Sequence, residues 1–115
     1  MGNYRTLLYS FGENDNATLL DITKGGGVDL TEYINKYREN GDLAVFSSNR
    51  KIDLFEAIEW VIEKGQDVLI KKADWFEYEE RVKLNDLVKA NPQTNFIFTF
   101  EKQHWRARSS YPYSR

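Results

Sequence analysis

The sequence predicts an α/β protein with a mostly parallel sheet, and two observations carry that prediction. Residues 28–46 and 52–70 show the same order of features: an acidic cap, an amphipathic helix, a glycine and a short apolar run. Residues 74–100 repeat this order less closely. Helices that alternate with continuous apolar strands favour a parallel sheet with right-handed crossovers. We therefore expect a single α/β domain built from helix–strand units, with an N-terminal strand or hairpin.

The N-terminal segment is expected to provide that strand or hairpin. Residues 4–11 are rich in β-forming side chains and predict a strand, and residues 12–16 are turn-forming. Residues 17–22 would be the returning strand, although so short a run could also be a helical turn. We expect this part to join the sheet at an edge and to run antiparallel there.

The best-defined unit spans residues 52–72. Asp53 occupies an N-cap position, and Glu56 follows three residues later, where its carboxylate could reach the free N–H groups of the first turn. Apolar residues then recur at helical spacing, at Leu54, Phe55, Ile58, Val61 and Ile62. Gly65 supplies a left-handed residue that ends the helix, and residues 68–70 predict a buried strand. The matching unit at residues 28–46 begins with the cap Asp29. The similarity of the two units is explained either by internal duplication or by convergence, because good caps and good strands have similar sequences.

The third unit is less regular. Asp74 and Glu77 repeat the cap pattern, residues 91–92 (Asn-Pro) end the helix, and residues 96–100 form the strand. The predicted buried face of this helix consists of Val82, Leu84, Leu87 and Val88. The charged residues at 79–81 are expected to form a solvated helix face.

Composition limits the class of protein. The chain has 115 residues, no cysteine and one histidine. These counts argue against disulfides, thiolate sites and a multi-histidine metal centre, so we expect no metal and no cofactor. No apolar run approaches the roughly 18 residues that a membrane span needs. We expect a soluble cytoplasmic protein that does not contact a membrane.

Charge divides the chain into two parts. The net charge is -2, yet residues 102–115 contain basic residues and no acidic one. We therefore expect an acidic α/β domain at 1–101 and a basic aromatic tail at 102–115. The tail mixes cations with aromatic rings. This composition suits a hot spot for binding a protein, or binding of a nucleic acid through phosphate contacts and base stacking. The predicted partner-binding residues are His104, Trp105, Arg106, Arg108, Tyr111 and Tyr113.

A ligand site is predicted at the carboxyl ends of the strands, where ligands of open parallel sheets lie. Polar residues follow the predicted strands there, and the glycines at 25–27 precede a capped helix whose N–H groups could approach a phosphate. The predicted ligand-binding residues are Gly25, Gly26, Gly27, Ser48, Arg50 and Lys72. Polar loops and a flexible glycine connector would explain the same residues without a ligand.

Residues 25–29, Gly-Gly-Gly-Val-Asp, resemble the glycine loop of macrodomains, which bind ADP-ribose, and Asn16 with Ala17 resembles their Asn-Ala segment. The resemblance covers only these residues, and we assign no family from it. A hydrolytic triad of Ser47 or Ser48 with His104 and Asp74 lacks the glycine pattern of a nucleophile elbow. The sequence therefore indicates no enzymatic constellation.

The function expected from the sequence is non-enzymatic binding. The chain would be an accessory or inhibitor protein, of the kind found in bacteria and phages, that contacts a protein partner or a second copy through its tail and its acidic helical faces. One alternative is a nucleotide- or phosphoester-binding protein or enzyme that uses the loop at 25–27 and the strand ends. Another is nucleic-acid binding through the tail, against which the acidic domain argues.

Overall fold

The computed structural model describes residues 11–22, 29–48 and 53–101. The strands are β1 (Ala17–Asp21), β2 (Leu43–Ser47), β3 (Asp67–Lys71) and β4 (Phe96–Phe100). The helices are α2 (Leu30–Arg38), α3 (Leu54–Glu63) and α4 (Tyr78–Ala90), and a short 3₁₀ turn, η1 (Ala73–Trp75), precedes α4. Every strand pairing among the described residues is parallel, which confirms the predicted α/β fold.

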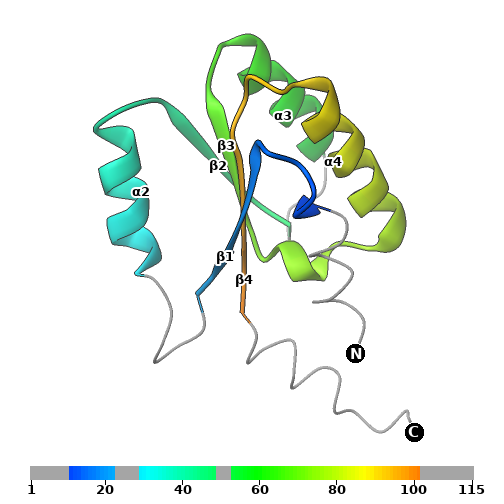
Figure 1. Cartoon of the computed structure of the whole chain (residues 1–115), viewed down its shortest axis with the longest axis horizontal. Helices are drawn as coiled ribbons and strands as arrows, with labels where there is room; N and C mark the ends of the chain where they lie inside the picture. The colour runs from blue at the N-terminus through cyan, green and yellow to red at the C-terminus, as the bar shows by residue number, and fades with distance from the viewer. Residues whose placement is uncertain (1–10, 23–28, 49–52, 102–115) are drawn as a thin grey trace, which may run out of the picture.

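The strands lie in the order β1-β4-β3-β2 (Figure 1). The chain crosses from β1 at one edge to β2 at the other, and then returns through β3 to β4. The predicted edge position of the N-terminal strand is confirmed for β1, but the antiparallel direction is wrong. Ala17 aligns with Phe96 in a parallel pair, because β1 continues into the crossover that contains α2. The predicted strand at 4–11 lies outside the described residues except for Phe11, whose backbone is helical.

Helices cover both faces of the sheet, with α2 on one side and α3 and α4 on the other (Figure 1). Successive side chains of a strand point to opposite faces, so each strand contributes to both cores. The α2 core consists of Leu43, Leu69 and Ile97, packed against Leu20, Leu30, Tyr33, Ile34, Tyr37 and Val45. Because both faces of β4 are covered, all five of its residues are buried.

The second core lies under α3 and α4 and is the larger of the two. Its central contact is Phe11 against Phe98, whose stacked rings have centroids 4.1 Å apart. Ile58 of α3 and Leu84 of α4 are fully buried in the same cluster. Aromatic pairs of this kind add roughly 0.5–1.5 kcal/mol beyond the area that they bury. Phe11 therefore fixes the segment before β1 against the sheet.

The helix starts agree only partly with the sequence pattern. Asp29 caps α2, since its carboxylate accepts from the Glu32 N–H at 3.2 Å. Asp53 stands at the N-cap of α3 but makes no side-chain cap bond, because its backbone is left-handed (φ 60°) and an N-cap normally has extended backbone. In α4 the cap is Glu77, in a capping box with Glu80. The expectation of a cap at Asp74 is wrong, because the chain first forms η1 there.

The buried stripe of α4 also differs from the prediction. Arg81, Leu84 and Val88 are buried, at the three- and four-residue spacing of one helix face. Val82 lies outside this stripe and is 41% exposed, so its predicted burial is wrong. Arg81 lies inside the stripe and is only 8% exposed, so the charged run around it is not a uniformly solvated face.

Asn16 closes the C-terminal end of α4. Its side-chain amide donates to the backbone carbonyls of Val88, Asn91 and Thr94 at 3.0, 2.9 and 3.0 Å. The Val88 and Asn91 carbonyls also accept backbone N–H groups, so the Asn16 amide adds a second donor there and ties the end of α4 to the turn at Thr94. Asn16 directly precedes β1, and the glycines at 25–27 lie outside the described residues.

Candidate functional site

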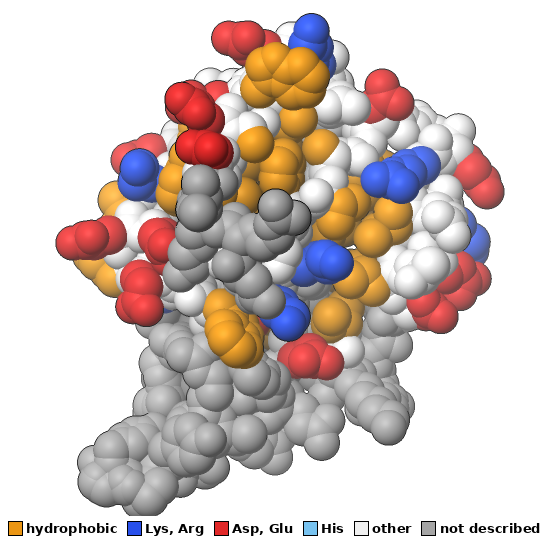
Figure 2. Space-filling model, turned by 180° about the vertical axis from the view of Figure 1, so that it is seen from behind, with side chains coloured by type: hydrophobic (Ala, Val, Ile, Leu, Met, Phe, Trp, Pro, Cys, Tyr) orange, Lys and Arg blue, Asp and Glu red, His pale blue; other side chains and the backbone are white. Residues whose placement is uncertain are grey.

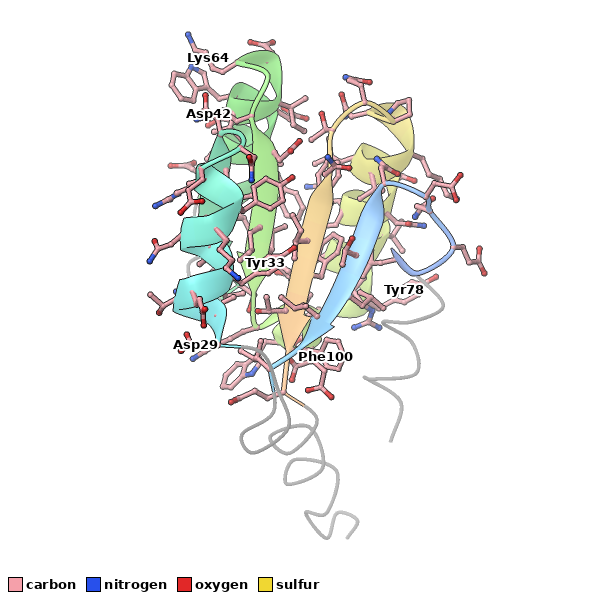
Figure 3. The ribbon with its side chains drawn as sticks, turned by 60° about the vertical axis from the view of Figure 1, so that its left-hand side comes forward. Asp29, Tyr33, Asp42, Lys64, Tyr78 and Phe100 are labelled. Carbon is pink, nitrogen blue, oxygen red and sulfur yellow. The ribbon has the colours of Figure 1, made fainter. Side chains whose placement is uncertain are left out.

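The four strands end at one edge of the sheet because all of them are parallel. Figure 3 shows Asp29, at the start of α2, and Phe100, at the end of β4, at this end of the molecule, with Asp42 and Lys64 at the opposite end. The connection after β1 leads to the α2 face, and the connection after β3 leads to the face of α4. A crevice forms where neighbouring connections separate to opposite faces, and ligands of α/β proteins bind there.

A cavity of about 340 Å³ occupies this position. It is lined by Ile22, Ser47, Lys71, Lys72, Asp74, Trp75, Thr99, Phe100 and Glu101. Ligand pockets of proteins range from roughly 300 to 1,000 Å³, so this one suits a small molecule. A second hollow, of about 420 Å³ between β2 and α3, adjoins it and shares Ser47 and Lys71.

Three neighbouring strands place polar side chains at the same level of the cavity. Ser47 pairs with Lys71 in the sheet, and Thr99 pairs with Leu20. Ile70 pairs with Phe98, so the next residues along, Lys71 and Thr99, are also neighbours. We call Ser47, Lys71 and Thr99 the polar row.

The polar row lies on the α2 face of the sheet. Each of its residues stands two or four positions after a member of the α2 core, namely Leu43, Leu69 or Ile97, and therefore shares its face. The sheet surface thus changes from apolar under α2 to polar at the cavity. The cavity therefore presents polar side chains where the sheet leaves the cover of α2.

Thr99 is the most deeply buried member of the polar row. Its side chain is fully buried, and its hydroxyl has no hydrogen-bond partner within the described part of the chain. A buried hydroxyl without a partner costs roughly 1–3 kcal/mol in proteins. Thr99 also lines the cavity, so a bound molecule could supply the missing partner.

Lys72 stands at the end of β3 with an unusual backbone. Its φ of 59° is left-handed, a conformation that is uncommon for residues other than glycine. The Lys72 ammonium lies 5.5 Å from the centroid of the Trp75 ring, a cation–π distance. The other left-handed non-glycine residue among those described, Asp53, lies at the same edge, before α3. Backbone strain of this kind accumulates at binding sites.

Arg81 supports the segment that carries Asp74 and Trp75 to the cavity. Its Nη1 atom donates to the Phe76 carbonyl at 2.7 Å. Burial lowers the pKa of the Arg81 guanidinium, and the charges of Glu77, Tyr78 and Glu80 partly oppose that shift. Asp74 is itself only 3% exposed. The side chains that line the cavity therefore carry both signs, Lys71 and Lys72 against Asp74 and Glu101.

The predicted ligand-binding residues do not all lie at the cavity. Lys72 lines the cavity, as expected. Ser48 does not, because its hydroxyl is fully buried and donates to the Lys72 carbonyl at 2.5 Å. Gly25, Gly26, Gly27 and Arg50 lie outside the described residues, as do His104, Trp105, Arg106, Arg108, Tyr111 and Tyr113.

Sequence reasoning missed Lys71, Thr99 and Trp75 as cavity residues. One signal for Thr99 was available, because it is the only polar residue in the apolar run 96–100. Of the triad drawn from the sequence, Ser47 and Asp74 both line the cavity, and His104 lies outside the described residues.

A separate surface feature lies on α3. Glu56, Glu59, Trp60 and Glu63 are all exposed and follow the spacing of one helix face. We call these residues the α3 acidic stripe. Trp60 is 59% exposed, and the ammonium of Lys64 lies 4.9 Å from its ring centroid. Figure 2 shows acidic side chains spread over the face of the molecule seen from behind, with apolar side chains between them.

The described ranges contain no cluster of three or more His, Cys, Asp or Glu side chains that could hold a metal ion. In the same ranges, no helix combines the length and apolar character of a membrane crossing. Comparison of the chain with protein-family models, curated proteins and solved structures finds no match. Functional inference therefore depends on the cavity and on the surface chemistry.

Proposed function

We propose that the protein binds a small phosphoester in the cavity at the carboxyl edge of the sheet. The observation that supports this proposal is the position of Lys71 and Lys72, two cations that line a cavity lying where α/β folds bind ligands. Lys71 is half-buried between two other strands, so solvent screens its charge less than that of an exposed lysine. A phosphate oxygen near Lys71 would form a charge-assisted hydrogen bond.

The expected test is a thermal-denaturation experiment with the whole chain and millimolar adenosine monophosphate. A ligand that binds only the native state raises the unfolding midpoint. Lys71→Met should abolish the rise, whereas Lys89→Met, at an exposed position of α4, should preserve it. A Lys71→Met protein that is stabilised as strongly as the unmodified protein would contradict the proposal.

A second candidate function is self-association through the α3 acidic stripe. Its three carboxylates flank an exposed indole ring, which is the residue type most enriched at binding hot spots. Residues 102–115 contain basic and aromatic residues and no acidic one, so they complement this stripe in charge. We propose that the tail of one copy binds the α3 acidic stripe of another.

Light scattering after size-exclusion chromatography tests this second candidate. The full chain should exceed the monomer mass at low salt, and truncation after Glu101 or the change Glu59→Lys should restore the monomer. Glu79→Lys, at an exposed position of α4, serves as the matched control. A monomeric full chain at low salt would rule out the stripe as a contact between copies.

A further inference from the structure

We infer that the ligand is a phosphomonoester of a hydroxyl-bearing molecule, such as a sugar phosphate or a nucleoside monophosphate, and that its phosphate group pairs with the Thr99 hydroxyl. This inference rests on the proposed function, because it assigns a chemical class to the ligand of the same cavity. It is carried by the polar row and by the two carboxylates, of Asp74 and Glu101, that line the same cavity.

The Thr99 hydroxyl is the first part of the argument. Thr99 lies within a strand whose other residues are Phe96, Ile97, Phe98 and Phe100, all buried. A valine has nearly the same shape and would bury no polar atom there. The hydroxyl makes no hydrogen bond to any described residue, although its burial carries a cost. A ligand atom in the cavity is a partner that would offset this cost.

The polar row indicates which chemical group of the ligand would lie beside the Thr99 hydroxyl. Ser47 and Thr99 contribute hydroxyl groups and Lys71 contributes an ammonium group, so all three side chains can donate hydrogen bonds. A phosphate group presents acceptor oxygens, and its negative charge is matched by the half-buried ammonium. The group of the ligand that contacts the polar row is therefore the phosphate.

The two carboxylates that line the cavity require different chemistry. Asp74 and Glu101 line it, and carboxylates accept hydrogen bonds but cannot donate them when ionised. Hydroxyl groups of a sugar would donate to these carboxylates. Trp75 and Phe100 offer apolar surface to the carbon skeleton or to a base. The ligand thus has an acceptor end and a donor end.

The charges and the volume of the cavity restrict the class of ligand further. The two lysines match the charge of about -2 that a phosphomonoester carries, whereas a di- or triphosphate would bring more negative charge than they can balance. A cavity of about 340 Å³ lies near the lower limit of ligand pockets and is small for a dinucleotide. A monophosphate with a single sugar satisfies both conditions.

Isothermal titration of the whole chain with ribose 5-phosphate, inorganic phosphate, ribose and ADP tests the assignment. Ribose 5-phosphate should bind about tenfold or more tightly than any of the other probes. If phosphate or ADP binds as tightly as ribose 5-phosphate, the class assigned here is wrong while anion binding stands. If none of the phosphate-bearing probes binds, or if ribose binds equally well, the proposed function fails as well.

Thr99→Val separates a ligand contact from a structural role. Without ligand, the variant should unfold at a higher temperature than the unmodified chain, because a buried polar atom has been removed. It should also bind ribose 5-phosphate about tenfold more weakly. Thr18→Val, at an exposed position of β1, should leave binding unchanged. A Thr99→Val protein with normal affinity would overturn the assignment.

If the Thr99→Val protein does not fold, the variants Thr99→Ser and Thr99→Ala test the inference instead. The serine retains the hydroxyl and should retain binding, whereas the alanine should lose it. Equal affinity of these two variants for ribose 5-phosphate would overturn the role of the hydroxyl. The serine also controls for the loss of the methyl group, since both variants lack it.

Discussion

The buried hydroxyl of Ser48 donates to the backbone carbonyl of Lys72 at 2.5 Å, and the Ser48 N–H donates to the Lys71 carbonyl at 3.1 Å. These bonds join the end of β2 to the end of β3. They also hold the left-handed backbone of Lys72, which places its side chain beside Trp75 at the cavity. Ser48 therefore contributes to the site through position and not through contact with a ligand.

Ser48→Ala tests this link. The change removes one of two donors to the Lys72 carbonyl, which also accepts from the Trp75 N–H at 3.0 Å, so we expect a loss of roughly 0.5–1.5 kcal/mol in the free energy of unfolding. Urea denaturation measures it. Thr31→Ala, at an exposed position of α2, is the control and should change stability little. Equal stability of Ser48→Ala and the unmodified chain would show that the bond to Lys72 contributes nothing.

Arg81→Met should loosen the segment between β3 and α4. The methionine can fill the buried space but cannot donate to the Phe76 carbonyl, so we expect a loss of roughly 1–3 kcal/mol. With Trp60 and Trp105 replaced by phenylalanine, the fluorescence of Trp75 reports on this segment. Its emission should move to longer wavelength in Arg81→Met. Lys83→Met, an exposed position of the same helix, should leave the emission unchanged.

Asn16→Asp should destabilise the fold more than Asn16→Ala does. The alanine removes the donor to three carbonyls at the end of α4, at an expected cost of roughly 1–3 kcal/mol. The aspartate in addition places a negative charge at the negative end of the helix dipole. Denaturation at neutral pH measures both changes, with the exposed Asn35→Asp as control. The reverse ranking of the two variants would contradict this account.

Tyr37 makes the stability of the fold sensitive to alkaline pH. Burial raises the pKa of Tyr37 to about 12 from the ordinary 10.0, and its hydrogen bond to Asp67 and the charge of that carboxylate act in the same direction. The folded protein retains the phenol proton more strongly than the unfolded chain. The resulting stabilisation is complete below pH 10 and is lost as the pH rises through 12.

Thermal denaturation between pH 9 and pH 12 measures this effect. Because lysines titrate in the same range, the comparison is between the unmodified chain and Tyr37→Phe. The stability difference between the two proteins should shrink as the pH rises through the interval from 10.0 to about 12. A difference that stays constant with pH would show that the pKa of Tyr37 is the same in the folded and unfolded states.

Much of the fold could be predicted from the sequence because the interior strands are continuous apolar runs. Residues 68–70 and 96–100 could be identified as strands without knowledge of their pairing partners, since a strand covered on both faces reads as a nearly continuous apolar run. The short strand β1 shows neither a long apolar run nor clear alternation. Its direction depends on pairing with β4, almost the full length of the described chain away, and local patterns carry no information about that pairing.

The sequence predicted where in the fold the candidate site lies, but not most of the residues that line it. Lys72 follows a predicted strand and lines the cavity at the carboxyl edge, where the rule for parallel sheets expects ligands. Lys71 and Thr99 meet only because β3 and β4 pair in one register, which the sequence does not reveal. Ser48 is buried and bonded to the Lys72 carbonyl, because a serine after a strand can turn inward to a carbonyl as readily as outward.

The pairing of β1 with β4 has a consequence for biosynthesis. β1 leaves the ribosome early, but the strand that it must contact is among the last parts of the described chain to emerge. Until β4 has been made, the position between β1 and β3 is empty. The edges of β1 and β3 that β4 will cover then have no pairing partner. Completion of the sheet must therefore follow the synthesis of Phe100, and a ribosome stalled before that point would hold a chain prone to aggregation.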